Sequence, residues 1–325
     1  MPKRSKNNFI PNPQLMALAP DVSGNRINGL GDPDPRRPEK VYWAEDPNTI
    51  AHGEMQKWFY TVDPGLPEFG TLRHKRQTVL DEPPEPLAKT QAEFDGANYL
   101  DWMNKDKDAG IFDKFGATQL SEDWVYEGIS LDYANVIVLG FAHDYAEISN
   151  APEPSAGLEV MRQYLRAVIG AKHVANQLQK MGYRSEPLTG PMSGKITMIP
   201  AALAAGFGEL GKHGSIITPE FGSSFRLSAV LTDAPVPLSS FQEYGIDAFC
   251  LHCQVCSNAC PPDAIFPDKQ TVRGTQKYYV DFDKCLPFFN EHQGCAICIA
   301  VCPWSRPGIG QNLATKLARR AERQS

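Results

Sequence analysis

The sequence has no long hydrophobic run, no excess of basic charge and no cysteine outside one C-terminal interval. Because no run of about 18 or more apolar residues occurs, we expect no membrane-spanning helix. The formal net charge of -6 disfavours a general nucleic-acid-binding function. The basic start, "MPKRSKNNFIPNPQ", lacks the apolar region of a secretory signal, so we expect a cytoplasmic protein.

All eight cysteines lie between residues 250 and 302. A disulfide-bonded protein would spread its cysteines along the chain, and thiols in a reducing compartment would not pair, so this clustering indicates a metal site. The cysteines form two groups, each closed by a proline: Cys250, Cys253, Cys256 and Cys260 before Pro261, and Cys285, Cys295, Cys298 and Cys302 before Pro303.

The first group has the bacterial ferredoxin spacing C-x2-C-x2-C-x3-C-P, and the second repeats its last three cysteines. In such runs three close thiolates bind one [4Fe–4S] cluster and the fourth cysteine binds the neighbouring cluster. Zinc is the alternative, but zinc sites use separate C-x2-C pairs and fit two interleaved runs poorly. We therefore assign two [4Fe–4S] clusters, one to Cys250, Cys253, Cys256 and Cys302 and the other to Cys260, Cys285, Cys295 and Cys298.

The rest of the chain divides by composition. Residues 1–118 are rich in Pro, Asp, Asn and Lys, and we expect an extended segment with few long helices that packs on the core. A disordered leader is the alternative, and it is weakened by aromatic residues that favour burial. These residues are Trp43, Trp58, Phe59, Tyr60 and Trp102.

Residues 119–240 have the pattern of an α/β core. The apolar run "YANVIVLGFA" and the segment "FRLSAVLTD" at 225–233 predict strands, and residues 157–182 have helical periodicity ending at Gly182. Helix and strand therefore alternate. A cysteine domain at 241–310 and a basic tail at 311–325, expected to be a short surface helix, complete the chain.

The string "GFGELG" at 206–211 matches the dinucleotide-binding pattern G-x-G-x-x-G. That function requires a strand before the glycines and a helix after them. Here "MIPAALAA" before it predicts a helix and "KHGSIITPEFG" after it predicts a loop. We expect the glycines to allow a tight loop and close backbone approach to a large flat group.

Three stretches together resemble a known family: "AAGFGELGKHGSIITPEFGSSFRLSAVLTDAPV", "FCLHCQVCSNACP" and "GCAICIAVCPWS". In this order they are similar to the corrinoid-dependent reductive dehalogenases, over about residues 130–305. Epoxyqueuosine reductases share a similar loop and ferredoxin module and are the nearest alternative.

The resemblance implies an α/β (α+β) fold, with a nitroreductase-like core that binds cobalamin base-off beside a ferredoxin-like module with two [4Fe–4S] clusters. It implies no histidine ligand on cobalt, and the chain has no D-x-H-x-x-G signature. The expected cobalamin-binding residues, with His213 of special interest, are Gly208, Gly211, Lys212, His213, Gly214, Thr218, Glu220 and Gly222.

The resemblance also implies a catalytic tyrosine and a basic partner. Tyr164 stands eighteen residues before Gly182 and matches the family's proton donor, and Arg226 matches the basic residue. A neighbouring cation favours the phenolate and eases proton release. Tyr164 could instead pack in the core, and Arg226 could lie on a surface or orient a phenolic or carboxylate substrate.

Two other residues are alternative acids. Tyr145 follows a predicted strand, and Asp144 is the nearby candidate for the aspartate that replaces the tyrosine in epoxyqueuosine reductases. Some family members carry an Asn after the Gly-Tyr pair, whereas "RSEPLTGPMSGK" has none. Gly190 or Ser193 fills this region and Lys195 offers a different polar group, so the substrate stays open.

Three functions follow in order of preference. The first is reductive dehalogenation of an organohalide, on a halogenated aromatic or alkene. The second is an epoxyqueuosine-type reductase acting on tRNA, which the acidic balance disfavours, and the third is a ferredoxin-like electron carrier. The sequence contains no flavin- or NAD-binding module, so we expect electrons from a partner such as ferredoxin or flavodoxin.

Overall fold

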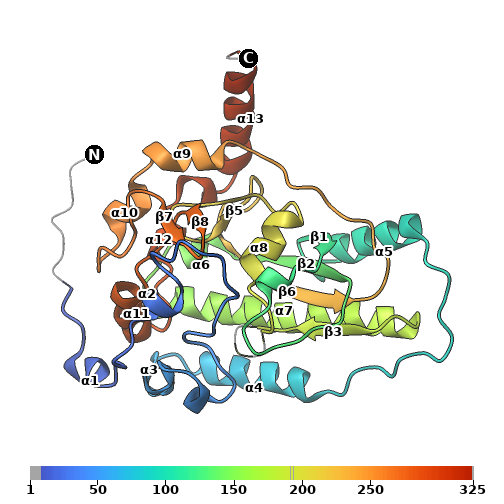
Figure 1. Cartoon of the computed structure of the whole chain (residues 1–325), viewed down its shortest axis with the longest axis horizontal. Helices are drawn as coiled ribbons and strands as arrows, with labels where there is room; N and C mark the ends of the chain where they lie inside the picture. Colours follow the sequence, from blue (N-terminus) through green and yellow to red (C-terminus); the bar gives the residue numbers. More distant parts are fainter. Residues whose placement is uncertain (1–8, 191, 193, 324–325) are drawn as a thin grey trace.

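The computed structural model describes residues 9–190, 192 and 194–323, and a four-stranded sheet lies at its centre (Figure 1). The sheet has the order β1-β2-β6-β3, and every neighbouring pair is antiparallel. Its strands are β1 (Lys114–Gln119), β2 (Asn135–Ala142), β3 (Ser185–Leu188) and β6 (Phe225–Thr232). The two predicted strands are therefore confirmed, and they pair with each other from Asn135 opposite Thr232 to Ala142 opposite Phe225.

Both faces of the sheet are covered, which explains why β2 is apolar after its first residue, Asn135. Ile137 and Leu139 pack with helices α5 (Gly96–Asp108) and α7 (Pro154–Lys180) on one face. Val136 and Val138 pack with helix α8 (Met198–Ala204) on the other face. The predicted helix at 157–182 is α7, which begins three residues earlier with a proline in its first turn.

The first 118 residues contain more helix than the sequence suggested. The short elements α1 (Pro13–Met16), α2 (Gly24–Ile27), η1 (Pro47–Thr49) and α3 (Gly53–Phe59) fit the expected extended segment. The helices α4 (Glu68–Asp81) and α5 are longer, with 14 and 13 residues. Only Phe69 of α4 is buried, so the sequence lacks the apolar stripe that would have predicted this helix.

The extended segment packs on the cysteine region. The side chain of Asn25 accepts a 2.8 Å hydrogen bond from the backbone of Phe282 and donates one of 2.8 Å to Asp281. The Tyr42 hydroxyl donates to the Asn290 side chain. Figure 1 shows the segment, coloured blue, lying beside α11.

The cysteine region begins after β6 and consists of short elements. These are α9 (Ile246–His252), α10 (Val255–Ala259), β7 (Gln270–Val272), β8 (Thr275–Lys277), α11 (Phe282–Glu291), α12 (Ile297–Ala300), η3 (Pro303–Ser305) and α13 (Ile309–Glu322). Helix α13 is the predicted basic tail, and it projects from the molecule in Figure 1. Its first half is not merely solvated, because Leu313 and Leu317 pack against a cluster that includes Ile246 and Trp304.

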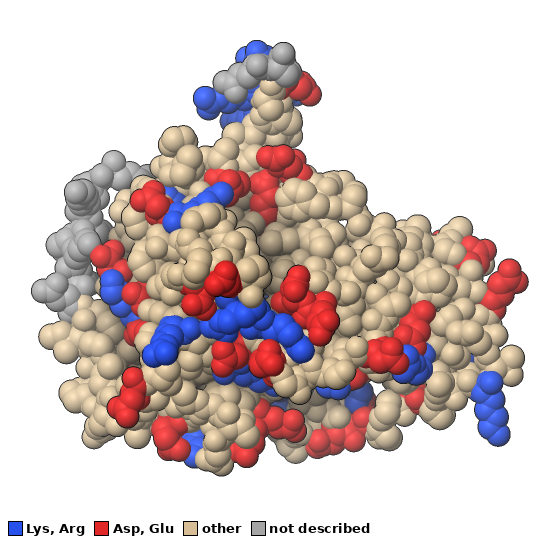
Figure 2. Space-filling model, viewed as in Figure 1, with Lys and Arg blue, Asp and Glu red and all other residues tan. Residues whose placement is uncertain are grey.

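Four small elements complete the core: η2 (Glu122–Trp124), α6 (Tyr145–Ile148), β4 (Glu209–Leu210) and β5 (Ile216–Ile217). None of the helices in the described part of the chain is long and apolar enough to cross a membrane. On the face in Figure 2, acidic side chains flank a central group of basic ones, so the two signs are mixed.

Candidate active site

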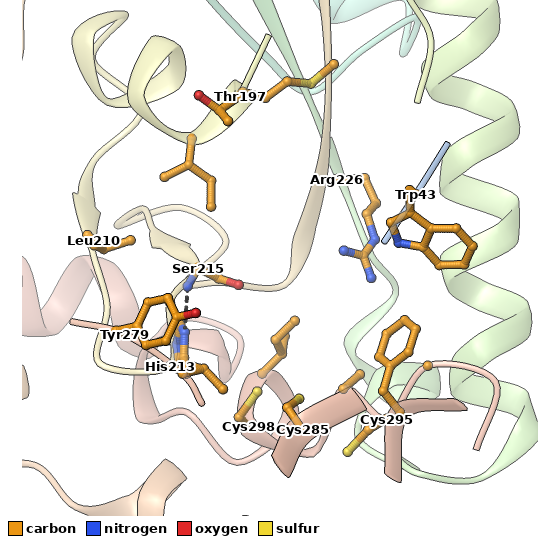
Figure 3. A pocket seen from close by; sticks show the side chains of 18 of the residues that line it. Trp43, Thr197, Leu210, His213, Ser215, Arg226, Tyr279, Cys285, Cys295 and Cys298 are labelled. Atoms are coloured by element: carbon orange, nitrogen blue, oxygen red, sulfur yellow. Dashed lines mark hydrogen bonds between the residues drawn. The ribbon is translucent and has the colours of Figure 1, made fainter. Parts of the chain in front are cut away.

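A cavity of about 1640 Å³ lies between the core and the cysteine region. Its walls come from the N-terminal segment, α4, α7, α8, β6, the loop after β4 and the cysteine region. Figure 3 shows Arg226 and Trp43 above Cys285, Cys295 and Cys298, with His213 and Ser215 on another wall. Ordinary small-ligand pockets occupy roughly 300–1,000 Å³, so this space can hold a larger group together with a small molecule.

Helix α7 presents one stripe of residues to the cavity. Gly157, Val160, Met161 and Tyr164 line it, and their spacing of three, four and seven residues places them on one helix face. Other residues of the helix, including Ala171 and those around it, pack against the sheet. The predicted acid Tyr164 therefore lies on the cavity-facing side of α7.

Arg226 reaches the same space from the start of β6. It pairs with Phe141 of β2, which packs on the α7 side of the sheet, so its side chain emerges on that side. The guanidinium carbon lies 5.4 Å from the centroid of the Tyr164 ring, a cation–π distance. The Arg226 Nε is buried and has no hydrogen-bond partner among the described residues. The structure thus brings together the two predicted catalytic residues.

His143 lies behind this pair as a neutral neighbour. Burial, and then the charge of Arg226, lower the pKa of His143 well below its ordinary value. Its Nδ1 is 3.4 Å from the hydroxyl of Ser224 and its Nε2 has no partner in the described structure. An uncharged imidazole leaves the cationic charge at this end of the cavity with the guanidinium group.

Two of the eight predicted cofactor-binding residues, His213 and Gly214, line the cavity. His213 is 5% exposed, and its Nδ1 accepts a 3.2 Å hydrogen bond from the backbone of Ser215 (Figure 3). Burial lowers the pKa of His213 to about 4, so the ring is neutral at neutral pH. Its Nε2 is buried without a partner among the described residues and is therefore available to a bound molecule.

The other three predicted glycines are explained by close packing and do not line the cavity. A Cβ on Gly208 would lie 2.1 Å from the carbonyl oxygen of Ile217, across the β4–β5 hairpin. One on Gly211 would lie 2.6 Å from the Ile217 side chain. One on Gly222, where φ is +58°, would lie 2.4 Å from the backbone of Ser305.

The three remaining predicted contacts also point elsewhere. Lys212 is buried, and its Nζ donates to the carbonyl oxygen of Leu251, 3.3 Å away, in the cysteine region. Thr218 accepts a hydrogen bond from the backbone of Phe221, which closes a turn. Glu220 is exposed and forms a 2.8 Å ion pair with Lys114.

The motif "GFGELG" instead links the core to the first cysteines. The Glu209 carboxylate accepts hydrogen bonds from the backbone of Tyr244, Ile246 and Asp247 at the start of α9. Helix α9 ends just before Cys253 and includes Cys250. No helix follows the glycines, because the chain turns into β5, so the dinucleotide-binding alternative lacks its structural context.

The alternative acids lie outside the cavity lining. The Tyr145 hydroxyl donates a 2.9 Å hydrogen bond to the carbonyl oxygen of Ala300. The Asp144 carboxylate caps α6 by accepting from the backbone of Ala146. Of the other polar candidates, Lys195 forms a 2.6 Å ion pair with Glu186. Gly190 lines a smaller adjoining pocket. Ser193 lies outside the described residues.

The eight cysteines are free thiols. Among the described residues, no three His, Cys, Asp or Glu side chains converge closely enough to hold one metal ion. Cys250, Cys253, Cys256 and Cys302 influence one another electrostatically, and Cys285, Cys295 and Cys298 are influenced by Cys260, while Cys298 is also influenced by Cys256. The assignment of the cysteines to two clusters therefore stays a prediction from their spacing.

Burial raises the pKa of Cys250 and of Cys285 to about 12 and that of Cys256 to about 11. Neighbouring thiols add to each of these shifts. Grouped, buried thiolates are costly unless metal binding compensates their charge, so the donor set fits iron–sulfur clusters.

Sequence reasoning missed the contribution of the N-terminal segment and α4 to the cavity. Trp43, Tyr60, Arg73 and Arg76 line it, although all four precede the predicted core. The aromatic islands around Trp43 and Tyr60 were a signal for burial, but no sequence pattern indicated what they would face.

Comparisons with known proteins agree with this arrangement. The model of the 4Fe-4S dicluster domain matches residues 249–305. The tetrachloroethene reductive dehalogenase of Desulfitobacterium hafniense is 30% identical over 223 residues, covering 64% of this chain and 40% of that protein. The epoxyqueuosine reductase of Vibrio cholerae is 32% identical over 150 residues, covering 42% of this chain and 40% of that protein.

A solved reductive dehalogenase, reported with a mechanism for B12-dependent dehalogenation, has the same fold. It has a TM-score of 0.74 and 22% identity, covering 88% of this chain and 46% of that one. The chain spans about two fifths of the length of the curated dehalogenases that it matches. It is a homologue of the reductive dehalogenases, and the epoxyqueuosine reductases are also its relatives.

Proposed function

We propose that this protein is a reductive dehalogenase that replaces a carbon–halogen bond of an organohalide with a carbon–hydrogen bond. The substrate takes up two electrons and one proton, the carbon–halogen bond breaks, and a halide ion leaves. The observation that carries the proposal is the pairing of Tyr164 with Arg226 in a large cavity whose floor contains cysteines of a dicluster domain.

Two [4Fe–4S] clusters and a base-off cobalamin are the proposed cofactors. The eight cysteines would hold the clusters in the two sets expected from their spacing. The volume of the cavity and the unpartnered nitrogens of His213 and Arg226 within its walls fit a large bound group beside a small substrate. When bound, cobalamin supplies a reducible cobalt centre that acts on the halogen or the carbon that bears it.

The protein's own residues bring the proton and the electrons. Tyr164 is the proposed proton donor, and the guanidinium group of Arg226 over its ring stabilises negative charge on the phenol oxygen as the proton leaves. Because Cys260, Cys285, Cys295 and Cys298 all line the cavity, the second cluster would deliver electrons into it. An external reductant such as ferredoxin or flavodoxin would supply them.

The epoxyqueuosine reductase alternative is weaker because its expected aspartate is used elsewhere. Asp144 caps α6 and does not line the cavity. The electron-carrier alternative does not explain the large cavity lined by Tyr164 and Arg226, because an electron carrier binds no substrate.

Halide release tests the proposal directly. The protein would be reconstituted without oxygen with iron, sulfide and cobalamin, then supplied with reduced methyl viologen and a panel of halogenated aromatics and alkenes. We expect cobalamin-dependent halide release that falls about 100-fold or more in Tyr164→Phe, in the range of a lost general acid.

Tyr145→Phe is the matched control, because it removes a phenol hydroxyl that bonds to Ala300 outside the cavity. It should retain halide release. Cobalamin retention without halide from any substrate would redirect the proposal to epoxide-type reduction, and failure to retain cobalamin would leave an electron carrier.

A further inference from the structure

We infer that the organohalide carries an anionic oxygen group on an aromatic ring, a carboxylate or a phenolate, and that Arg73 and Arg76 of α4 bind it. This inference deepens the proposed function and rests on it. It assigns a role in substrate choice to a helix outside the predicted core.

Helix α4 directs one face into the cavity. Phe69, Arg73, Arg76 and Gln77 line the space, and their spacing of four, seven and eight residues places them on one side of the helix. Lys75, between the two arginines, is exposed to solvent instead. Two guanidinium groups therefore share the wall that approaches Tyr164.

Arg76 is a partly buried cation without a countercharge among the described residues. Its Nη2 donates to the carbonyl oxygen of Thr189, 3.1 Å away, and its Nε is buried with no partner in the described structure. Burial lowers the pKa of Arg76, and the ionisable groups that oppose this shift are the phenols of Tyr164 and Tyr60. A Cβ on Gly190 would lie 2.7 Å from the Arg76 Nη2, so the guanidinium group packs directly on that glycine.

Arg73 is held in place by neutral groups. Its Nη2 donates a 3.0 Å hydrogen bond to the Gln293 side chain, and its guanidinium carbon lies 5.4 Å from the centroid of the Tyr60 ring. Gln293 is itself fixed by a 2.6 Å hydrogen bond to the carbonyl oxygen of Phe59. These contacts orient the guanidinium group but leave its charge uncompensated.

Some other cations of the cavity wall are paired with carboxylates, whereas Arg273 and Lys277 also form no ion pair within the described residues, and burial lowers the pKa of both. Arg36 pairs with Asp32 at 2.8 Å and with Glu39 at 2.6 Å, and Lys269 pairs with Asp247 at 2.8 Å. Within the described ranges, Arg73, Arg76 and Arg226 form no ion pair. A partly buried charge without a partner is unfavourable, so Arg76, with Arg73 and Arg226 lining the same cavity, favours a ligand that brings negative charge.

The neighbouring side chains indicate the rest of the ligand. Trp43, Phe59, Tyr60 and Phe69 line the cavity beside the arginines and provide apolar faces for a planar ring. A guanidinium fork binds a carboxylate through two parallel hydrogen bonds and a phenolate through one or two. An aromatic ring with an anionic oxygen can pack on the aromatic side chains and bind the guanidinium groups, whereas a small haloalkene can only pack on the aromatic side chains.

The test compares charged and neutral substrates in the reconstituted enzyme. Arg73→Gln and Arg76→Gln would be assayed with bromobenzoate, bromophenol above its pKa and neutral bromobenzene, with Lys75→Gln as the control on the solvent side of the same helix. We expect KM for the charged substrates to rise about tenfold or more in Arg76→Gln, the loss of a charge-assisted hydrogen bond, with bromobenzene unaffected. Comparing benzoate with phenol identifies which anion is preferred.

A second readout does not depend on turnover. Calorimetric binding of halogen-free benzoate and phenolate to the cofactor-loaded protein should weaken about tenfold in Arg76→Gln and stay unchanged in Lys75→Gln. Benzoate or phenolate binding that depends on Arg76 without any halide release would support the anion site and contradict the dehalogenase proposal.

Two results would overturn the inference and leave the dehalogenase proposal intact. One is an equal loss of kcat on charged and neutral substrates in Arg76→Gln, because Arg76 would then act through Tyr164. The other is dehalogenation of bromobenzene with the same kcat/KM as the charged substrates in the wild-type enzyme and in both variants.

Discussion

At the scale of residues, two substitutions of Arg226 distinguish the effect of its charge on Tyr164 from the effect of its shape. The Arg226 guanidinium carbon lies 5.4 Å from the centroid of the Tyr164 ring, and a lysine ammonium group cannot reproduce the planar shape of the guanidinium group. Arg226→Lys keeps the positive charge, whereas Arg226→Met removes it at similar length.

We expect kcat to fall about tenfold in Arg226→Lys and about 100-fold in Arg226→Met, because the charge carries more of the stabilisation than the planar shape. Steady-state halide release measures both values, and the absorbance of bound cofactors verifies equal loading. Equal rates in the wild type and both variants would remove Arg226 from the mechanism.

Burial of His213 makes the stability of the folded protein depend on pH, and the direction of this dependence follows from the lowered pKa of the imidazole. Burial lowers its pKa to about 4 from an ordinary value of 6.5, so the unfolded chain binds the proton more readily than the folded one. Stability from this group is therefore complete above about pH 6.5 and is lost as the pH falls towards 4.

The wild type should lose on the order of 2 kcal/mol more unfolding free energy than His213→Gln between pH 7 and pH 5. Urea unfolding of the cluster-free protein at the two pH values measures this difference. An identical pH dependence in the wild type and the variant would mean that the imidazole is accessible to protons in the folded state.

At the scale of elements, Gly222 allows the turn after β5 to pack closely on the backbone of η3. Its φ is +58°, and a Cβ there would lie 2.4 Å from the Ser305 backbone. Gly128 is a matched control, because its φ is +78° but a Cβ would meet nothing within 4 Å.

Gly128→Ala should cost about 1 kcal/mol, the strain of a positive φ alone. Gly222→Ala should cost about 3 kcal/mol or more, because a backbone clash is added to that strain. Thermal unfolding of both variants gives the comparison, and equal losses would show that the core and the cysteine region can separate at this contact at little cost.

Elements with a regular burial pattern could be predicted from the sequence. Strand β2 is apolar after its first residue and α7 has a long apolar stripe, so both were identified, as were the grouped cysteines by their spacing. Helix α4 was missed because its polar residues face solvent and its inward face carries two arginines. The structural roles of the glycines in the loop could not be predicted. Gly208 packs against Ile217 and Gly222 packs against Ser305, and only the folded chain brings these residues into contact.

At the scale of the whole molecule, the N-terminal segment depends on the cysteine region although it holds no cysteine. Asn25 bonds to residues at the start of α11, and Tyr42 bonds to Asn290 near its end. Cys285 lies within the same helix, so loss of its cluster should loosen both partners.

Hydrogen exchange before and after iron chelation tests this coupling. We expect amide protection in residues 12–60 to fall together with that in α11, while β2 and β6 remain protected by their own ladder. Protection of residues 12–60 that survives chelation would mean that the segment is held by the core alone.

The cavity has one wall from the N-terminal segment and α4 and another from α7, β6 and the cysteines. Selection can therefore alter the first wall, and with it the range of ligands that the cavity accepts, while the wall that holds the cysteines stays unchanged. An exchange of residues 40–80 with the corresponding stretch of a homologue would transfer the ligand preference of that homologue and leave the other walls of the cavity unchanged. This stretch is therefore the place to begin engineering.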